Sequence, residues 1–227
     1  MNNKNKIWKP LISDPKILEE YSTGLGVKSQ ICFVDIYSTE ETELDIYDIN
    51  PISLIILVPT NDEKICKKRD EFGYKITGYQ KVWFMKQYIQ NSCGAVALLH
   101  SILNNNLIEL EEESIAKTLL NLKSESNDLA KERGLYLINN KKIEYLHEKL
   151  SSRDISNDCF VTEFHYISFV NINGNIIELD GRLPCPISHG VFKSGEFLKS
   201  SLKVIKEKFI YPLGIDGKVA IIAVCIK

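Results

Sequence analysis

Cys93 is the side chain in this sequence best placed to act as a nucleophile. It lies in the stretch MKQYIQNSCGAVALLH, residues 85–100, where a polar run meets an apolar helical pattern. Unpaired N–H groups and the positive end of the helix dipole at a first helical turn favour a thiolate, the reactive form of cysteine. Gly94 would allow the backbone to approach a substrate closely. Most cysteines are packing residues, so this stretch alone does not establish catalysis.

A nucleophilic thiol needs a base, and the chain has four histidines. His100 shares the predicted helix with Cys93 but lies about 10 Å further along its axis, at 1.5 Å per residue, too far to reach the sulfur. His147, in a polar helical pattern, and His189, in a loop bounded by proline and glycine, are expected at the surface. His165 begins a strand that could face the helix start, and it is the predicted base.

A β-hairpin is predicted around Asn173–Gly174, a dipeptide that supplies positive φ at both turn positions. In this register Ile167 lies opposite Asp180. Side chains alternate along a strand, so His165 and Asp180 project from one face as diagonal neighbours, about 7 to 8 Å apart. A shift of one residue would put them on opposite faces. Either residue alone has an ordinary structural explanation, but together they predict an acid that orients the imidazole.

Gln87, six residues before Cys93, is the candidate oxyanion donor. Its side-chain N–H could stabilise the negative oxygen of a tetrahedral intermediate, with the backbone N–H of Cys93 as the second donor. Glutamine is common on surfaces, so this signal is weak by itself. The four residues Gln87, Cys93, His165 and Asp180 would together supply the oxyanion donor, nucleophile, base and orienting acid of a cysteine hydrolase.

The elements that must position these residues indicate an α+β fold. Strand patterns at 31–37 and 52–58 precede Cys93, and the second is apolar on both faces, as expected for a central strand. Helical patterns fill the middle of the chain after Cys93, at about 110–122, 127–138 and 141–150. An amphipathic helix containing Phe197 and Phe209 and a strand at 219–226 follow the hairpin. Strands thus surround a helical middle, unlike a regular βαβ series.

Composition narrows the class of protein further. With 227 residues, 44% of them hydrophobic, the chain can form one well-buried core, and we expect a single domain over 1–227 in which 61–80 is a loop. A net charge of -2 argues against nucleic-acid binding. The sequence has neither a signal-peptide pattern nor a run of membrane-spanning length, so no membrane contact is expected.

The six cysteines are scattered, without a C-x-x-C pair or histidines at zinc-finger spacing. They are expected to be reduced thiols in the cytoplasm or the nucleus, and neither a metal nor a cofactor is expected.

Two segments resemble the ubiquitin carboxyl-terminal hydrolase family of cysteine proteases, specifically its short single-domain members. FMKQYIQNSCGAVALLH is similar to the family's nucleophile segment, with Gln87 and Cys93 at the family spacing. FHYISFVNINGNIIELDGRLPCPISHG is similar to its histidine and aspartate segment, with His165 and Asp180 at the family separation. WKPLISDPKILEEYSTGLG and FVDIY resemble the family's N-terminal region, so the resemblance covers nearly the whole chain.

The resemblance implies a papain-like α+β fold with a central antiparallel sheet, flanking helices and a knotted backbone. It implies an enzyme that hydrolyses the bond after the C-terminal glycine of ubiquitin. We expect the chain to act as a monomer. Cys93 would attack the carbonyl, His165 would transfer the proton, Asp180 would hold the imidazole and Gln87 would stabilise the oxyanion. Pro10 and Leu11 match an early ubiquitin-contacting stretch.

The segment before His165, SSRDISNDCFVTEFH, matches the family's active-site crossover loop but lacks the glycine often found there. Its contour from Leu150 to Phe164 is at most about 50 Å, which would leave an opening of roughly 20 Å or less. A folded domain of about 75 residues approaches 30 Å in diameter. We therefore expect the leaving group to be a small adduct or a short peptide. Cys159 in this loop is a candidate redox-sensitive thiol, although an incidental cysteine is the simpler reading.

Three other functions are open. The same fold could act on a ubiquitin-like modifier, which nothing in the sequence separates from ubiquitin. The protein could bind and stabilise ubiquitin without turnover, although all four catalytic positions are filled. An acyltransferase with the same cysteine, histidine and aspartate is the third alternative. The acidic run at 109–114 could meet the basic tail of ubiquitin, but acids at a helix start are common.

Overall fold

The computed structural model describes residues 6–28, 31–60, 74–75, 82–123, 128–153, 162–214 and 218–227. Within these residues the helices are α1 (Pro15–Leu25), η1 (Glu41–Tyr47, a 3-10 helix), α3 (Cys93–Leu103), α4 (Ile115–Leu120), α5 (Leu129–Asn139), α6 (Lys141–Ser151), α7 (Phe197–Ile205), η2 (Lys206–Ile210, a π-helix) and α8 (Tyr211–Leu213). The strands are β1 (Ile31–Asp35), β2 (Pro51–Pro59), β3 (Tyr74–Lys75), β4 (Phe164–Ile172), β5 (Asn175–Leu179), β6 (Ile187–Val191) and β7 (Ala220–Ile226).

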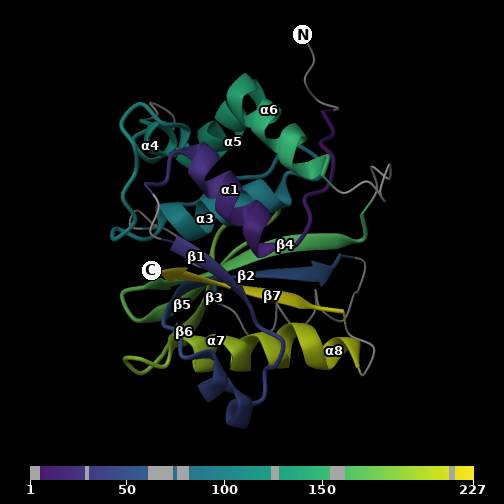
Figure 1. Cartoon of the computed structure of the whole chain (residues 1–227), viewed down its shortest axis with the longest axis vertical. Coiled ribbons are helices and arrows are strands. Elements are labelled where there is room, and N and C mark those ends of the chain that lie inside the picture. Colours follow the sequence, from purple (N-terminus) through teal and green to yellow (C-terminus); the bar gives the residue numbers. More distant parts are fainter. Residues whose placement is uncertain are drawn as a thin grey trace.

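The strands form one seven-stranded sheet in the order β1-β7-β2-β4-β5-β6-β3, and every neighbouring pair is antiparallel. The apolar strand β2 lies between β7 and β4, as its sequence predicts. Helices α1, α3, α4, α5 and α6 lie on one side of the sheet, whereas α7 and α8 lie on the other (Figure 1). The predicted α+β class with a central antiparallel sheet is confirmed, and the knotted backbone stays a prediction.

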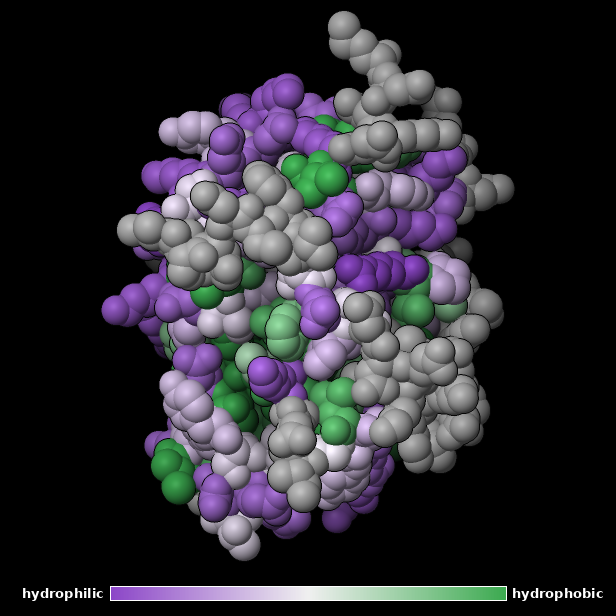
Figure 2. Space-filling model, turned by 90° about the vertical axis from the view of Figure 1, so that its right-hand side faces the viewer, coloured by the Kyte–Doolittle hydropathy of each residue, from purple (hydrophilic) through white to green (hydrophobic). Residues whose placement is uncertain are grey.

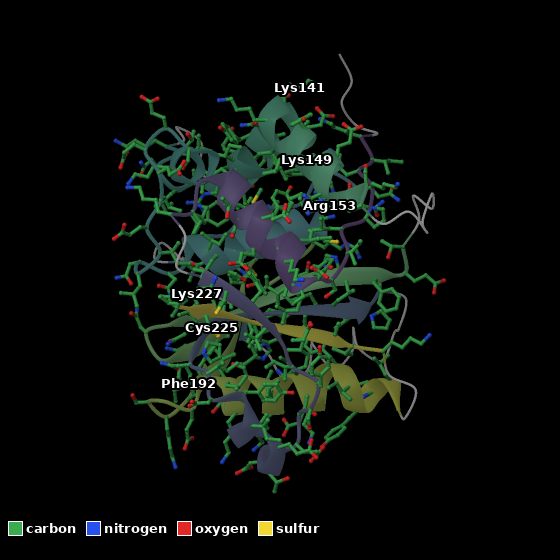
Figure 3. All side chains as sticks on the ribbon, viewed as in Figure 1. Lys141, Lys149, Arg153, Phe192, Cys225 and Lys227 are labelled. Carbon is green, nitrogen blue, oxygen red and sulfur yellow. The ribbon has the colours of Figure 1, made fainter. Side chains whose placement is uncertain are left out.

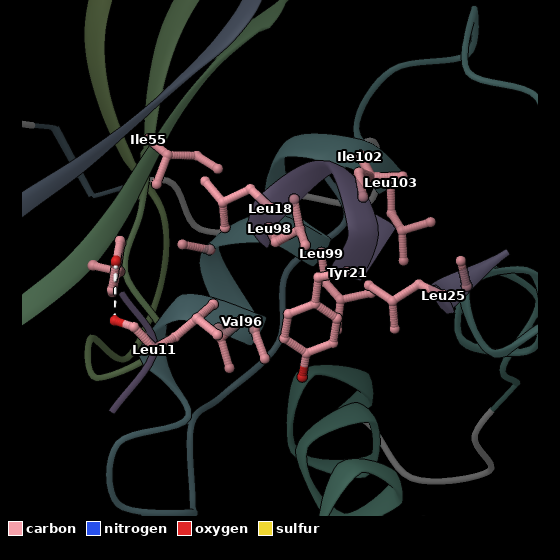
Figure 4. Close-up of a cluster of buried hydrophobic side chains, with 14 of the residues drawn as sticks. Leu11, Leu18, Tyr21, Leu25, Ile55, Val96, Leu98, Leu99, Ile102 and Leu103 are labelled. Atoms are coloured by element: carbon pink, nitrogen blue, oxygen red, sulfur yellow. Dashed lines mark hydrogen bonds between the residues drawn. The ribbon is translucent and has the colours of Figure 1, made fainter. Parts of the chain in front are cut away.

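Helix α3 is the centre of the larger core. All eleven of its residues are buried, because it packs on β4 and β2 while α1 covers its outer side. Figure 4 shows Leu18, Tyr21 and Leu25 of α1 facing Leu98, Leu99, Ile102 and Leu103 of α3. A helix that is apolar all round is expected to be buried in this way. The second core, which includes Ile167, Phe169, Leu202 and Phe209, lies between the sheet and α7 with η2.

The predicted hairpin register is confirmed. Ile172 pairs with Asn175 and Ser168 pairs with Leu179 across β4 and β5, and Asn173 and Gly174 have φ values of 52° and 79°. The ladder between these strands ends at Ser168, so His165 itself pairs with Val58 of β2. The turn therefore fixes which residues of the two strands face each other, and β2 extends the sheet to His165.

Helix α1 was not among the predicted elements, although its boundary signals are strong. The Asp14 carboxylate accepts hydrogen bonds from the backbone N–H groups of Lys16 and Ile17 at 2.8 and 3.0 Å, Pro15 occupies the first turn, and Gly26 ends the helix at φ 95°. An N-cap aspartate, an early proline and a C-terminal glycine are typical of a helix of this length.

Most remaining boundaries agree with the sequence patterns, except that α4 covers only the second half of the pattern at 110–122. The short strand β3 lies inside the predicted loop at 61–80, most of which is outside the described residues. Residues 154–161 of the predicted crossover loop, including Cys159, are also outside them. In the parts of the chain described here, none of the helices has the length and apolarity needed to span a membrane.

Candidate active site

Cys93 is the first residue of α3, at the position predicted from the sequence, and its side chain is only 4% exposed. The preceding turn contains Asn91 at φ 65°, a conformation that asparagine tolerates better than most residues. The Ser92 hydroxyl donates to the Ile89 carbonyl at 2.9 Å and does not cap α3. The side chain of Ser92, the N-cap residue, therefore leaves the first N–H groups of α3 uncapped, and a helix N-terminus favours a negative charge such as a thiolate.

His165 and Asp180 form a buried pair. The Nε2 atom of His165 lies 2.6 Å from Oδ1 of Asp180, and the two residues are 4% and 1% exposed. The same Oδ1 atom accepts the backbone N–H of Arg182 at 2.9 Å, which fixes the carboxylate. Burial lowers the pKa of the His165 imidazole, but the charge and hydrogen bond of Asp180, together with Cys93, outweigh burial and raise it.

The thiol of Cys93 interacts with the other side of this imidazole. Nδ1 of His165 is buried and has no hydrogen-bond partner among the described residues. This nitrogen is therefore available to exchange a proton with the sulfur of Cys93. Burial raises the pKa of the Cys93 thiol, yet the imidazole, the N–H of Tyr166 and the charge of Arg182 outweigh that effect, and the pKa is lowered. The opposite shifts of the two groups favour a thiolate beside an imidazolium.

Gln87 lies beside the aspartate segment. Its backbone N–H donates to the Gly181 carbonyl at 2.8 Å, and its side-chain Nε2 donates to the Ile89 carbonyl at 3.0 Å. A β-carbon added at Gly181 would lie 3.0 Å from Cβ of Gln87 and 2.9 Å from Val96, so only glycine permits this close approach. An amide nitrogen carries two N–H bonds. One of them donates to the Ile89 carbonyl, and the second is the predicted oxyanion donor.

A cleft of about 410 Å³ opens beside Cys93. Its lining includes two predicted contact residues, Pro10 and Leu11, together with Leu57, Asn91, Phe164 and Tyr166. Gly94 lets α3 approach this lining, since a β-carbon there would be 3.1 Å from Leu11. Figure 2 views the molecule from the side on which β2 ends and β4 begins, and it shows apolar side chains gathered near the middle of a largely polar face.

Residues 8–210 match the family model described as ubiquitin carboxyl-terminal hydrolase, family 1. The chain belongs to this family. A probable ubiquitin carboxyl-terminal hydrolase of Dictyostelium discoideum is 34% identical over 212 residues, which cover 89% of this chain and 82% of the relative. Ubiquitin carboxyl-terminal hydrolase isozyme L1 of Homo sapiens is 33% identical over 206 residues, covering 88% and 90% of the two chains.

The fold agrees with family membership. The catalytic domain of Trichinella spiralis UCH37, solved bound to ubiquitin vinyl methyl ester, superposes with a TM-score of 0.77 at 24% identity and covers 100% of this chain and 99% of that domain. At this identity the likeness supports the fold and nothing finer. The family resemblance expected from the two sequence segments is confirmed.

The surface positions predicted for His147 and His189 are wrong, because both side chains are buried. His147 is 1% exposed, because the polar pattern of α6 has one inward stripe with Ile143, His147 and Leu150. The polar face of the same helix carries Lys141 and Lys149 (Figure 3). The spacing of the stripe, four and then three residues, was the available signal.

The side chain of His189 is also buried, at 1% exposed. Its Nε2 lies 2.9 Å from Oε2 of Glu178, which is fully buried, and its Nδ1 lies 2.7 Å from Nζ of Lys208. His189 lies in strand β6, not in the expected loop, and these charged partners come from β5 and η2, so the local sequence around His189 does not indicate them. A buried charge requires such partners.

His100 does not reach Cys93, as its position on the helix predicts. It instead contacts Phe84 and Met85, which precede Gln87. Its ring is fully buried, stacks on Phe84 at 5.3 Å, and accepts the backbone N–H of Met85 at Nε2 over 3.1 Å. Burial lowers its pKa to about 4, so the ring is neutral. It therefore holds Phe84 and Met85 against α3. In the described parts of the chain, His, Cys, Asp and Glu form no cluster of three that could hold a metal ion.

Proposed function

We propose that this protein is a deubiquitinating thiol hydrolase that cleaves the bond after the C-terminal glycine of ubiquitin, with Cys93, His165, Asp180 and Gln87 as its machinery. Family membership confirms the predicted enzyme class. The observation that carries the residue assignment is the buried series of thiol, imidazole and carboxylate, with 2.6 Å between His165 and Asp180.

The reaction follows from the roles of these groups. The Cys93 thiolate attacks the glycine carbonyl carbon, and the resulting oxyanion accepts hydrogen bonds from Gln87 Nε2 and the Cys93 N–H. The His165 imidazolium gives its proton to the leaving amine, and a thioester of ubiquitin remains on the sulfur. Neutral His165 then takes a proton from water, whose oxygen attacks the thioester and releases ubiquitin with its C-terminal carboxylate.

Hydrolysis of a fluorogenic C-terminal amide of ubiquitin tests this proposal. Cys93→Ala and His165→Ala are expected to lose nearly all activity, and Asp180→Asn part of it. Cys32→Ala, at a partly exposed cysteine remote from the site, is the matched control. Full turnover by Cys93→Ala would overturn the assignment. Tight ubiquitin binding by an inactive wild-type chain would support a binding module instead, and faster cleavage of a ubiquitin-like modifier would change the substrate.

The proposal also includes the domain extent, the oligomeric state, the location and the leaving group. We infer one catalytic domain over residues 1–227, acting as a monomer in the cytoplasm or nucleus on ubiquitin carrying small adducts or short peptides. The short distance in sequence between α6 and β4 supports the preference for small leaving groups. These two elements flank the cleft at Ser151 and Phe164. An isopeptide-linked di-ubiquitin cleaved as fast as a small ubiquitin amide would contradict it.

A further inference from the structure

One side of the cleft is formed by irregular backbone. Residues 9–13, here called the N-terminal wall, line the cleft beside Cys93 and belong to neither a helix nor a strand. A backbone outside regular structure must obtain its hydrogen bonds from elsewhere. The position of this wall therefore depends on the side chains that bind its carbonyl groups.

Three side chains hold the wall and the adjoining Trp8, one from the turn before α3, one from β4 and one from α6. Asn91 Nδ2 donates to the Trp8 carbonyl at 2.9 Å, and the Tyr166 hydroxyl donates to the Leu11 carbonyl at 3.2 Å (dashed line in Figure 4). Asn91 and Tyr166 are close in sequence to Cys93 and His165, so both also belong to the surroundings of the catalytic pair. The third side chain, His147, comes from α6 and is separate from the catalytic groups.

His147 binds the wall through one ring nitrogen and α1 through the other. Its Nε2 lies 2.8 Å from the Lys9 carbonyl and its Nδ1 lies 3.1 Å from the Tyr21 hydroxyl. Because a carbonyl can only accept, Nε2 carries the proton, and Nδ1 accepts from Tyr21. Burial lowers the pKa of the ring to about 4, which keeps this neutral form. Trp8 covers the ring face with centroids 4.3 Å apart.

We propose that His147 is a positioning residue that fixes the N-terminal wall for the peptide tail of the substrate. The inference rests on the proposed function, which puts the C-terminal tail of ubiquitin in this cleft. Its Lys9 contact joins the wall to α6, and Ser151, one turn later on α6, lines the same cleft. His147 thus sets the distance between two sides of the cleft without touching Cys93 or His165, and its removal weakens substrate binding more than turnover.

The test compares His147→Leu, His147→Gln and Tyr21→Phe in the 227-residue chain. Leucine keeps apolar volume without a donor, glutamine keeps an N–H for Lys9, and phenylalanine removes only the hydroxyl that orients the imidazole. We expect His147→Leu to raise KM for the ubiquitin amide about fivefold or more, as expected for an unpaired buried carbonyl, with kcat changed less than about twofold. His147→Gln should restore most of the affinity, and Tyr21→Phe should give an intermediate KM.

Two further measurements separate positioning from general damage. The Kd for ubiquitin, measured in the Cys93→Ala background, should rise in parallel with KM. Alkylation of Cys93 by iodoacetamide, which does not need the wall, should keep its rate. A fall in kcat at constant KM, or an unchanged Kd, would overturn the inference. If His147→Leu does not fold, Tyr21→Phe decides it, and an unchanged KM there would overturn the inference. A wild-type chain without activity on the ubiquitin amide would instead contradict the proposed function.

Discussion

Nε2 of His165 and Oδ1 of Asp180 are 2.6 Å apart, although fifteen residues and a hairpin turn separate them in the chain. The carboxylate opposes the effect of burial on the imidazole and raises its pKa. The same imidazole helps to lower the pKa of the Cys93 thiol. The pair therefore determines the pH range in which thiolate and imidazolium coexist, and this range is open to measurement.

Replacing Asp180 by asparagine should narrow the pH range in which the Cys93 thiolate and the His165 imidazolium coexist. Without the carboxylate charge the imidazolium is less stable, so the pKa of His165 falls and the basic limb of kcat/KM moves to lower pH. Turnover at the optimum should fall about tenfold, less than the 10²- to 10⁴-fold contribution of the acid–base group itself, because His165 remains in place. Profiles of kcat/KM from pH 5 to 10 for both proteins measure the shift. A basic limb that stays in place would mean that another group controls it.

Gln87→Ala should lower kcat on the order of 10²-fold, the usual effect of removing one oxyanion donor. KM should change little, because the oxyanion forms only after attack. Gln90→Ala is the matched control, since Gln90 is exposed and three residues away. Steady-state rates on the ubiquitin amide provide the comparison. Equal rates for both variants would remove Gln87 from the mechanism.

Gly181→Ala should reduce kcat/KM at least about tenfold, since displacement of a catalytic group by about 1 Å can cost 10²-fold. The new methyl group would press on Val96 and on Cβ and the backbone nitrogen of Gln87, at 2.9 to 3.1 Å. Gly174→Ala is the contrasting variant. At φ 79° it should lose about 1 kcal/mol of stability, yet its β-carbon meets nothing within 4 Å. An active Gly181→Ala enzyme would show that this contact does not position Gln87.

Acid should destabilise the fold through His100 and His147. Burial lowers both pKa values to about 4, whereas the histidines of an unfolded chain bind protons near their ordinary pKa of 6.5. The unfolded state therefore gains protons first, and stability falls as pH drops from about 6.5 to 4, by up to about 3 kcal/mol per histidine. The raised pKa of His165 acts in the opposite direction.

Urea unfolding at pH 7.5, 6.5, 5.5 and 5.0 measures this dependence before most carboxylates titrate. His147→Gln, which has no titrating group at this position, should reduce the slope of unfolding free energy against pH. An identical slope in wild type and His147→Gln would show that His147 does not contribute.

Local patterns predict the elements around the active site well. The turn at Asn173–Gly174 fixes the hairpin register by its backbone geometry alone, and this register brings His165 and Asp180 to one face. The change to helical spacing at Cys93 likewise marks the start of α3. These features depend on neighbours in sequence, which is why they can be read without coordinates.

The errors concern contacts between distant segments. His147 is buried because Tyr21 and Lys9, 126 and 138 residues away, supply partners for both ring nitrogens. His189 is buried because Glu178 and Lys208 meet it from other elements. A polar local sequence predicts exposure. For His147 the inward spacing with Ile143 and Leu150 already indicates burial, whereas for His189 only the tertiary partners reverse the prediction.

The complete burial of α3 also determines how slowly its backbone should meet solvent. Amide protons from Val96 to Leu103 are shielded by α1 on one side and by the sheet on the other, so their exchange with deuterium requires opening of the entire core. We expect these amides to exchange slowly, so Cys93, the proposed nucleophile, begins a rigid helix, and we expect the less protected segments around it to accommodate different substrates.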